Sequence, residues 1–383
     1  MVPPPMYFAT VTMDAPVLGA SSAPFCAGNM GGISWIVCLS DGSICLLGNR
    51  NQLEAMLEEN PNTDKSQRFV TPTVLAKVDL PNAQSMRQFL VLGANLNEGG
   101  EVVVRCIAVA CAPIDESNSS QISEHVVEIA VTLNESTSSA NVGGYIPADG
   151  RILRIANWSD TTEQIGALVE LNDGSLLEYV PSPDLAPPGA LIPSSAEPML
   201  EPCPWIAGLR SATASGVSSD SRKKLVIVGM SRRSRLYFGE RILSDACSSF
   251  LLSPTHRFLS YATLGSRSQL RFIPLSALAE YDSLMGSEEN LLALGEDYEP
   301  RNLERGSRVV AILPEAPTTV LQLPRGNLEG IYPRALVLPF AMRLIEQEKY
   351  GEAMETMRRQ KIDLNLFCDM DPVHFLEGNG VAK

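Results

Sequence analysis

Histidine, the side chain that most often performs acid–base chemistry, is rare in this chain. Histidine occurs only three times, at His125, His256 and His374. His256 follows Ser253 and Thr255 in a predicted loop, and a histidine beside a hydroxyl is the pair that many hydrolases use. The same segment also suits a surface or capping histidine, and no spaced pair of carboxylates between apolar residues accompanies it. The sequence therefore predicts no catalytic residue, and we expect that the protein is not an enzyme.

Motifs for cofactors and metals are equally scarce. The eight cysteines include no Cys-x-x-Cys pair, so zinc ligands do not occur at their usual spacing. The glycine cluster at residues 28–32 precedes a predicted strand, whereas a phosphate-binding loop leads from a strand into a helix. Cys38 and Cys45 flank an Asp-Gly turn, where a two-residue hairpin would pair them directly, and we predict reduced core residues there. We expect no cofactor and no metal site.

Basic residues gather in one part of an otherwise acidic chain. The 30 Lys and Arg stand against 44 Asp and Glu, and the net charge of −14 disfavours autonomous binding of nucleic acid. A basic cluster lies within residues 222–235, and Arg267 and Arg271 follow in the next predicted hairpin. Consecutive repeats of a β-rich fold could place all of these side chains on one rim. Aromatic residues are sparse nearby, so base stacking is not indicated and a solvated surface stays the alternative. The possible basic rim consists of Arg222, Lys223, Lys224, Arg232, Arg233 and Arg235.

Short predicted strands joined by turns fill the first 330 residues. The segments 33–47 and 167–179 each hold two β-rich runs joined by Asp-Gly-Ser, and Asp-Gly accepts the positive φ of a type I′ turn. Such a hairpin is half of a propeller blade of roughly 40–45 residues, which predicts about seven blades. A closed ring of blades also leaves no exposed sheet edge. The predicted fold class is mainly β, a WD40-like β-propeller, and a pair of β-sandwiches is the alternative.

The hydrophobic period changes after residue 330. Tyr350, Ala353, Met354 and Met357 are spaced to share one face of a helix. The segment before them is also helical in composition, although Pro339 must begin or kink that helix. Two helices cannot bury their apolar faces alone. We therefore predict a propeller domain at residues 1–330 and the beginning of a TPR-like α-solenoid at residues 331–383.

Two motifs near this boundary carry a family resemblance. They read Glu-Arg-Gly-Ser-Arg at residues 304–308, and Pro-Arg-Gly-Asn-Leu-Glu at 324–329 followed by Arg-Ala-Leu-Val-Leu at 334–338. They resemble the passage from the second propeller into the α-solenoid in the scaffold subunit of the Elongator complex, the largest of its six subunits. Pro339 departs from the uninterrupted helix of that family. The junction residues to which the resemblance gives a structural role are Arg305, Gly306, Arg325, Gly326, Asn327, Leu328, Glu329 and Arg334.

The resemblance implies a function without catalysis. The family's scaffold supports a catalytic subunit, a radical-SAM and acetyltransferase-like protein, in the C5 carboxymethyl-type modification of the tRNA wobble uridine. It implies other Elongator subunits as partners, especially the catalytic subunit and the separate propeller subunit, with tRNA reached through the complex. The region that the family uses for homodimerisation is expected to be absent from this chain. The alternative from a different class is a freestanding propeller that binds peptides or proteins.

The predicted cellular compartment depends on two sequence features, a signal peptide and a membrane-spanning segment. The first residues hold no basic region followed by an apolar core, so no signal peptide is indicated. No apolar run reaches the roughly 18 residues that span a bilayer. We expect a cytoplasmic protein that could have a nuclear pool.

Overall fold

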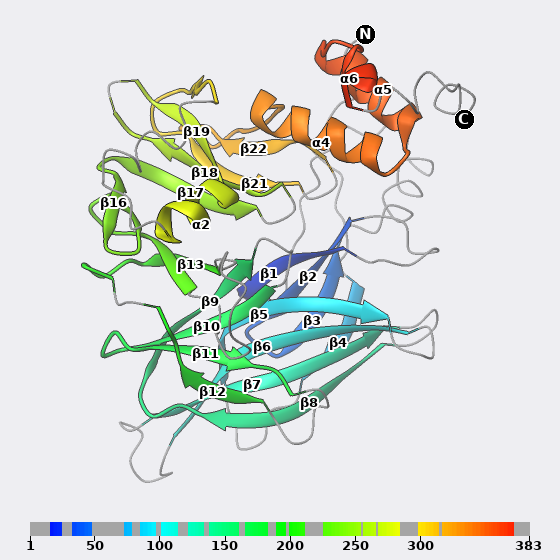
Figure 1. The fold of residues 1–383 in the computed structure, drawn as a ribbon. Coiled ribbons are helices and arrows are strands. Elements are labelled where there is room, and N and C mark those ends of the chain that lie inside the picture. Colours follow the sequence, from blue (N-terminus) through cyan, green and yellow to red (C-terminus); the bar gives the residue numbers. More distant parts are fainter. Residues whose placement is uncertain are drawn as a thin grey trace. The chain divides into compact units, whose positions relative to one another are not determined.

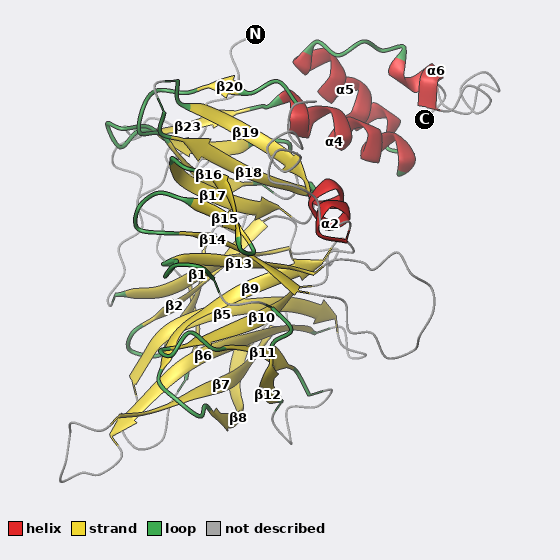
Figure 2. Cartoon of the chain, turned by 60° about the vertical axis from the view of Figure 1, so that its left-hand side comes forward, coloured by secondary structure: helices red, strands yellow, loops and turns green. Residues whose placement is uncertain are grey.

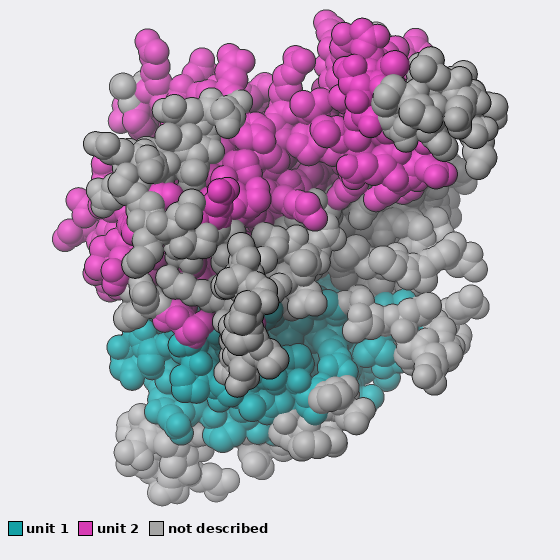
Figure 3. Space-filling view, viewed as in Figure 1, with its two compact units in different colours: residues 1–158, 165–194 teal, residues 159–164, 195–383 magenta. Residues whose placement is uncertain are grey.

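Strands make up most of the computed structural model (Figures 1 and 2). The chain divides into two compact units, of which unit 1 holds residues 1–158 and 165–194 and unit 2 holds residues 159–164 and 195–383 (Figure 3). The structure describes residues 16–24, 33–47, 73–78, 85–96, 101–113, 122–133, 138–160, 165–182, 189–196, 199–210, 225–253, 256–265, 267–283, 298–313 and 316–370.

The strands of unit 1 form three groups of four, each a meander in which consecutive strands are neighbours. The first group is β1 (Val17–Pro24), β2 (Ile33–Leu39), β3 (Ser43–Leu47) and β4 (Thr73–Lys77). The second is β5 (Ser85–Leu96), β6 (Val102–Pro113), β7 (Ile122–Leu133) and β8 (Ser138–Pro147). The third is β9 (Ile152–Asp160), β10 (Ile165–Leu171), β11 (Leu176–Val180) and β12 (Ala190–Pro193).

Unit 2 continues the pattern and then changes to helices. Its first group is β13 (Trp205–Arg210), β14 (Leu225–Met230), β15 (Leu236–Phe238) and β16 (Arg241–Ser244). The next is β17 (Cys247–Ser253), β18 (Phe258–Thr263), β19 (Gln269–Pro274) and β20 (Arg301–Asn302), and the last is β21 (Arg308–Ile312), β22 (Thr319–Gln322) and β23 (Leu328–Ile331). The helices are α2 (Leu275–Ser283), α4 (Arg334–Glu346), α5 (Tyr350–Gln360) and α6 (Leu366–Met370). No helix in the described part of the chain is long and apolar enough to cross a membrane.

The order of the strands distinguishes a β-propeller from a pair of β-sandwiches, the two folds that the sequence leaves open. Consecutive strands pair within every group, as in a propeller blade, whereas a β-sandwich sends its chain between two facing sheets. The described residues form six such groups, five of four strands and one of three. The count of about seven blades stays a prediction.

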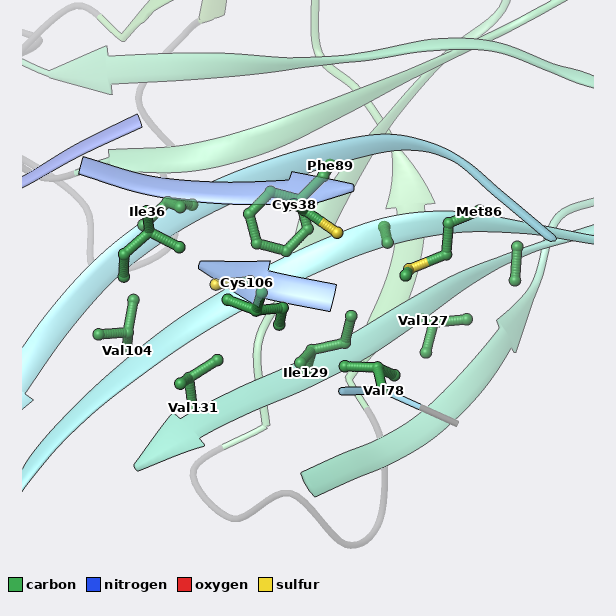
Figure 4. Close-up of a cluster of buried hydrophobic side chains, with 14 of the residues drawn as sticks. Ile36, Cys38, Val78, Met86, Phe89, Val104, Cys106, Val127, Ile129 and Val131 are labelled. Atoms are coloured by element: carbon green, nitrogen blue, oxygen red, sulfur yellow. The ribbon is translucent and has the colours of Figure 1, made fainter. Parts of the chain in front are cut away.

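The cores of unit 1 lie between neighbouring groups of strands. Side chains alternate across a strand, so a strand that is covered on both faces reads as a continuous apolar run. β6 is such a strand: Val104 and Cys106 face the first group, and Ile107 and Val109 face the third. Figure 4 shows the cluster on the first of these faces, with Ile129 of β7 among the side chains it labels.

A three-residue loop closes the first Asp-Gly hairpin, so the prediction of a two-residue type I′ turn is wrong there. Cys38 pairs with Ile44, the loop comprises residues 40–42, and Gly42 has a φ of 86°. This loop is a type I turn followed by one left-handed residue, which needs glycine only at its last position. The extra loop residue shifts the register by one, so the predicted direct pairing of Cys38 with Cys45 is also wrong. Both cysteines are buried, as the sequence predicts.

The described strands end with β23 at Ile331, and helices follow. α4 begins at Arg334, and Pro339 lies inside it without ending it. α5 buries Ala353 and Met357, whereas Met354 is 44% exposed because it lies about 100° around the helix from Ala353. Asp371 and Pro372 would cap and begin a further helix at residues 373–376, and these residues lie outside the described part of the chain. The domain boundary at residue 330 stays a prediction, because α4 packs on the strands of its own unit.

Candidate functional site

Two buried carboxylates in unit 1, Glu128 and Glu124, connect segments that lie far apart in the sequence. Glu128 on β7 is 3% exposed and accepts hydrogen bonds from the Tyr179 hydroxyl and from the Gly189 amide at 2.8 Å. Burial, with the hydrogen bond to Glu128, raises the pKa of Tyr179. Glu124, 8% exposed, accepts from the Arg87 guanidinium at 3.1 Å and from the backbone of the next group of strands. Each carboxylate connects segments distant in sequence, which is a structural use of charge.

His256, the histidine with a neighbouring hydroxyl, lies between a blade and a helix in unit 2. Its Nδ1 is 3.0 Å from Ser253 Oγ, and its ring stacks on Phe340 of α4 with 6.5 Å between centroids. It is 6% exposed, and burial together with the Arg343 guanidinium lowers its pKa to about 4. A nucleophilic dyad needs an accessible ring oriented by a carboxylate, whereas this ring is buried beside a cation. Because the ring is buried, the interpretation of His256 as a surface histidine is wrong, whereas its capping role stays a prediction. The ring joins α4 to the turn after β17.

α4 is held by two separate apolar clusters. Leu336, in its first turn, is fully buried among side chains of the last two groups of strands, including Phe272 and Ile331. Leu344, near its other end, packs with Met357 of α5 in the cluster that the three C-terminal helices share. One continuous helix with a core at each end fixes the direction in which the helical region leaves the strands.

The junction motifs combine left-handed glycines with exposed side chains. Gly306 and Gly326 have φ values of 92° and 88°, a conformation that favours glycine, in the connections before β21 and between β22 and β23. The two turns meet, because a Cβ on Gly306 would lie 3.5 Å from Pro324. The other junction residues are all exposed, with Leu328 42% exposed and Arg334 at the first position of α4. The structural role predicted for those side chains stays a prediction.

The structure places only part of the predicted basic rim. Arg222, Lys223 and Lys224 lie outside the described residues. Arg232 and Arg233 are exposed in the turn between β14 and β15. Arg235 is half-buried and lies 3.9 Å from Glu201, which also accepts a hydrogen bond from the Tyr237 hydroxyl. Arg267 and Arg271 are exposed at and near the turn between β18 and β19.

One aromatic residue at this surface is absent from the sequence-based prediction. Trp205, the first residue of β13, is 54% exposed. It pairs across the strands with Met230, and Met230 directly precedes the turn that carries Arg232 and Arg233. Trp205 and Met230 lie 25 residues apart in the chain, so only the pairing of β13 with β14 reveals that they are neighbours.

Strands grouped as blades, leading into helices that pack as hairpins, define a β-propeller followed by an α-solenoid. Two family models match the chain in that order: "ELP1 N-terminal second beta-propeller" at residues 1–310 and "ELP1 alpha-solenoid" at residues 334–380. The chain belongs to the ELP1 family. The resemblance seen in the junction motifs is thereby confirmed, as is the fold class of propeller and solenoid.

Curated relatives carry the name "Elongator complex protein 1". The protein of Schizosaccharomyces pombe is 38% identical over 152 residues, which cover 40% of this chain and 12% of that protein. The protein of Mus musculus is 29% identical over 269 residues, 68% of this chain and 18% of that protein. The protein of Drosophila melanogaster is 46% identical over 80 residues, 21% of this chain and 6% of that protein. The chain thus spans a minor part of the length of each of these relatives.

Proposed function

We propose that this protein is a non-catalytic scaffold subunit of Elongator. The observation that carries the proposal is the order of the two matched regions on one chain, the second propeller and then the α-solenoid. The names of the relatives support membership of the complex. In the proposed role the chain supports the radical-SAM and acetyltransferase-like catalytic subunit during C5 carboxymethyl-type modification of the tRNA wobble uridine.

The geometry around α4 supports a role in positioning partners. A scaffold must hold its interaction surfaces in a constant relative orientation, which requires a rigid joint between blade and solenoid. Leu336 and the stacked pair of His256 and Phe340 provide such a joint on one side of the helix. The proposal assigns the buried histidine to this joint and gives it no catalytic step.

The partners in this proposal are the other Elongator subunits, especially the catalytic subunit and the separate propeller subunit. The proposed compartment is the cytoplasm, with a nuclear pool. Purification of the tagged chain from its own cells should recover the catalytic subunit. Fractionation of the same cells checks the compartment.

Nucleoside mass spectrometry of total tRNA, after disruption of the gene and of any second copy, tests the pathway. Loss of the C5 carboxymethyl-type wobble uridines, with recovery when the gene is restored, is the expected result. Normal levels after disruption would contradict the Elongator role and would favour the freestanding binding module.

A further inference from the structure

The acidic charge of the chain is distributed unevenly along the sequence. Residues 1–194 hold 8 of the 30 basic residues and 21 of the 44 acidic ones. Residues 195–383 hold 22 basic and 23 acidic residues, so this half is close to neutral. A basic surface in the second half therefore does not have to overcome the charge of its own half.

Backbone hydrogen bonds connect several turns of unit 2 along one edge. The Cys247 amide donates to the Ser234 carbonyl at 2.6 Å, and the Leu264 amide donates to the Ala246 carbonyl at 2.9 Å. The Leu303 amide then donates to a carbonyl in the turn between β18 and β19, at 2.8 Å. These bonds join the turn between β14 and β15 to the connection before β17, and the turn between β18 and β19 to the connection before β21.

The same edge includes the turn between β22 and β23. The Ser248 hydroxyl donates to the Ser307 carbonyl at 2.8 Å, and Gly306 lies against Pro324. Antiparallel pairing explains the arrangement, since every second connection of a meander emerges at the same end. α2 and α4 follow β19 and β23 directly and so lie at the opposite ends of the strands (Figure 2).

Each of the three hairpin turns on this edge carries arginine, as does the connection before β21. We call the set the arginine edge: it consists of Arg232, Arg233, Arg235, Arg267, Arg305 and Arg325. All but Arg235 are exposed. Among the described residues, the acidic side chains in the connections at the same edge are Glu201, Asp245 and Glu304, and Glu201 already faces Arg235 and the Tyr237 hydroxyl. The edge thus has an excess of positive charge, and its cations are guanidinium groups, which bind phosphate oxygens in a bidentate manner.

Trp205 adds a stacking surface at one end of the arginine edge. Its side chain is 54% exposed, and its strand partner Met230 directly precedes the turn that carries Arg232. Exposed aromatic rings beside a basic groove stack on the bases of single-stranded or looped nucleic acid. An acidic protein would also be attracted by the arginines, and exposed tryptophan also occurs at protein interfaces, so the test below includes an acidic polypeptide.

We propose that the arginine edge and Trp205 bind RNA, with the guanidinium groups on phosphates and the indole on an unpaired base. The choice of RNA rests on the proposed function, because tRNA is the substrate of the proposed complex. The inference goes beyond that function in assigning a direct RNA contact to the propeller region itself.

Fluorescence anisotropy of the 383-residue chain with a labelled, unmodified tRNA transcript tests the inference. The edge variant R232Q/R233Q/R267Q removes three exposed charges, and K349Q/R358Q/R359Q removes three exposed charges at the start of and along α5 as its matched control. We expect the edge variant to bind at least about tenfold more weakly, with the slope of log K against log salt reduced by roughly 2. The control should bind within about twofold of the parent chain.

The variant W205A separates stacking from charge. It should weaken binding by about tenfold while the salt slope stays unchanged. Equal binding by the edge variant and its control would overturn the inference, as would failure of the parent chain to bind tRNA. Binding of a poly-glutamate peptide as tight as that of tRNA, with the same loss in the edge variant, would assign the edge to an acidic protein instead. Melting temperatures of all variants establish that each is folded.

Failure of this inference can be told apart from failure of the proposed function. Cells that lack the gene are supplied with the edge variant, and their tRNA nucleosides are measured. Full recovery of the wobble modification, with unchanged tRNA binding in solution, rejects the arginine edge and keeps the scaffold role. Unchanged nucleosides after disruption of the gene reject the scaffold role, while the solution measurements still decide whether the edge binds RNA.

Discussion

Unit 1 and unit 2 use charged side chains in opposite ways. In unit 1 Glu124 and Glu128 are 8% and 3% exposed, and each holds together segments that are far apart in the sequence. In unit 2 Arg232 and Arg233 are exposed at the tip of a turn. A buried charge is tolerated only when it is paired and hydrogen-bonded, whereas an exposed one costs little and contributes little to stability.

The contrast separates charges that maintain the fold from charges that can meet a partner. Removal of a buried carboxylate leaves its donors without acceptors, so its effect is on folding. Removal of an exposed arginine from a turn leaves the fold intact, so its effect is on binding. The following predictions test this separation in order of decreasing effect.

The largest loss of stability is expected for Glu128→Ala. The substitution leaves the buried Tyr179 hydroxyl and the half-buried Gly189 amide without their acceptor, which should lower the free energy of unfolding by about 3 kcal/mol. Denaturation by urea measures the loss. Glu128→Gln keeps a carbonyl acceptor and should recover part of it, and the exposed Asp149→Ala should change little. A midpoint for Glu128→Ala equal to that of Asp149→Ala would refute the structural role.

His256 lies in unit 2 but is buried, so we expect it to affect stability as the buried carboxylates of unit 1 do. Its folded pKa of about 4 is below the usual 6.5, so the unfolded chain binds the proton more readily as the pH falls below 6.5. Above pH 6.5 the contribution of the neutral ring to the free energy of unfolding is fully present. About 2 kcal/mol of this contribution should be lost between pH 7.5 and pH 5. The variant His256→Gln should lack this part of the pH dependence in thermal unfolding measured at both pH values. Parallel curves for the parent chain and the variant would contradict the assignment.

A smaller effect is expected at the turn between β22 and β23. Gly326 has a φ of 88° with open space around it, so Gly326→Ala should cost only the left-handed backbone, about 1 kcal/mol. Asn327→Ala, at an exposed neighbour, should cost less than about 0.5 kcal/mol. Urea denaturation of both variants checks the difference. An equal loss in the two would mean that the Asn327 side chain, as well as the glycine backbone, stabilises the junction.

The smallest effect on stability is expected for the exposed arginines. Arg232→Gln with Arg233→Gln should change the free energy of unfolding by less than about 0.5 kcal/mol. The same double variant should weaken binding to tRNA, because each lost phosphate contact reduces affinity and salt dependence. Calorimetry and anisotropy on one preparation check both statements. A lowered melting temperature would show that these charges belong to the fold, as Glu128 does.

Several elements could be predicted because their causes are local. Apolar residues recur every second residue in the strands and about every 3.6 residues after residue 330, and both periods follow from backbone geometry. Gly42 and Gly326 take the left-handed turn positions that favour glycine. The length of the loop at Gly42 could not be predicted, because Asp-Gly suits both a two-residue and a three-residue loop and the choice decides which residue Cys38 faces.

The sequence by itself determined a chain of hairpins ending in helices, an acidic surface with a basic segment, and the motifs of its family. These properties depend on the types of neighbouring residues and on their spacing. The tertiary structure alone decided that His256 is buried against α4, that Trp205 pairs with Met230 at the start of an arginine-bearing turn, and that several distant turns share one edge. Such contacts depend on which strands pair and on the end at which each connection emerges, and spacing along the chain does not contain that information.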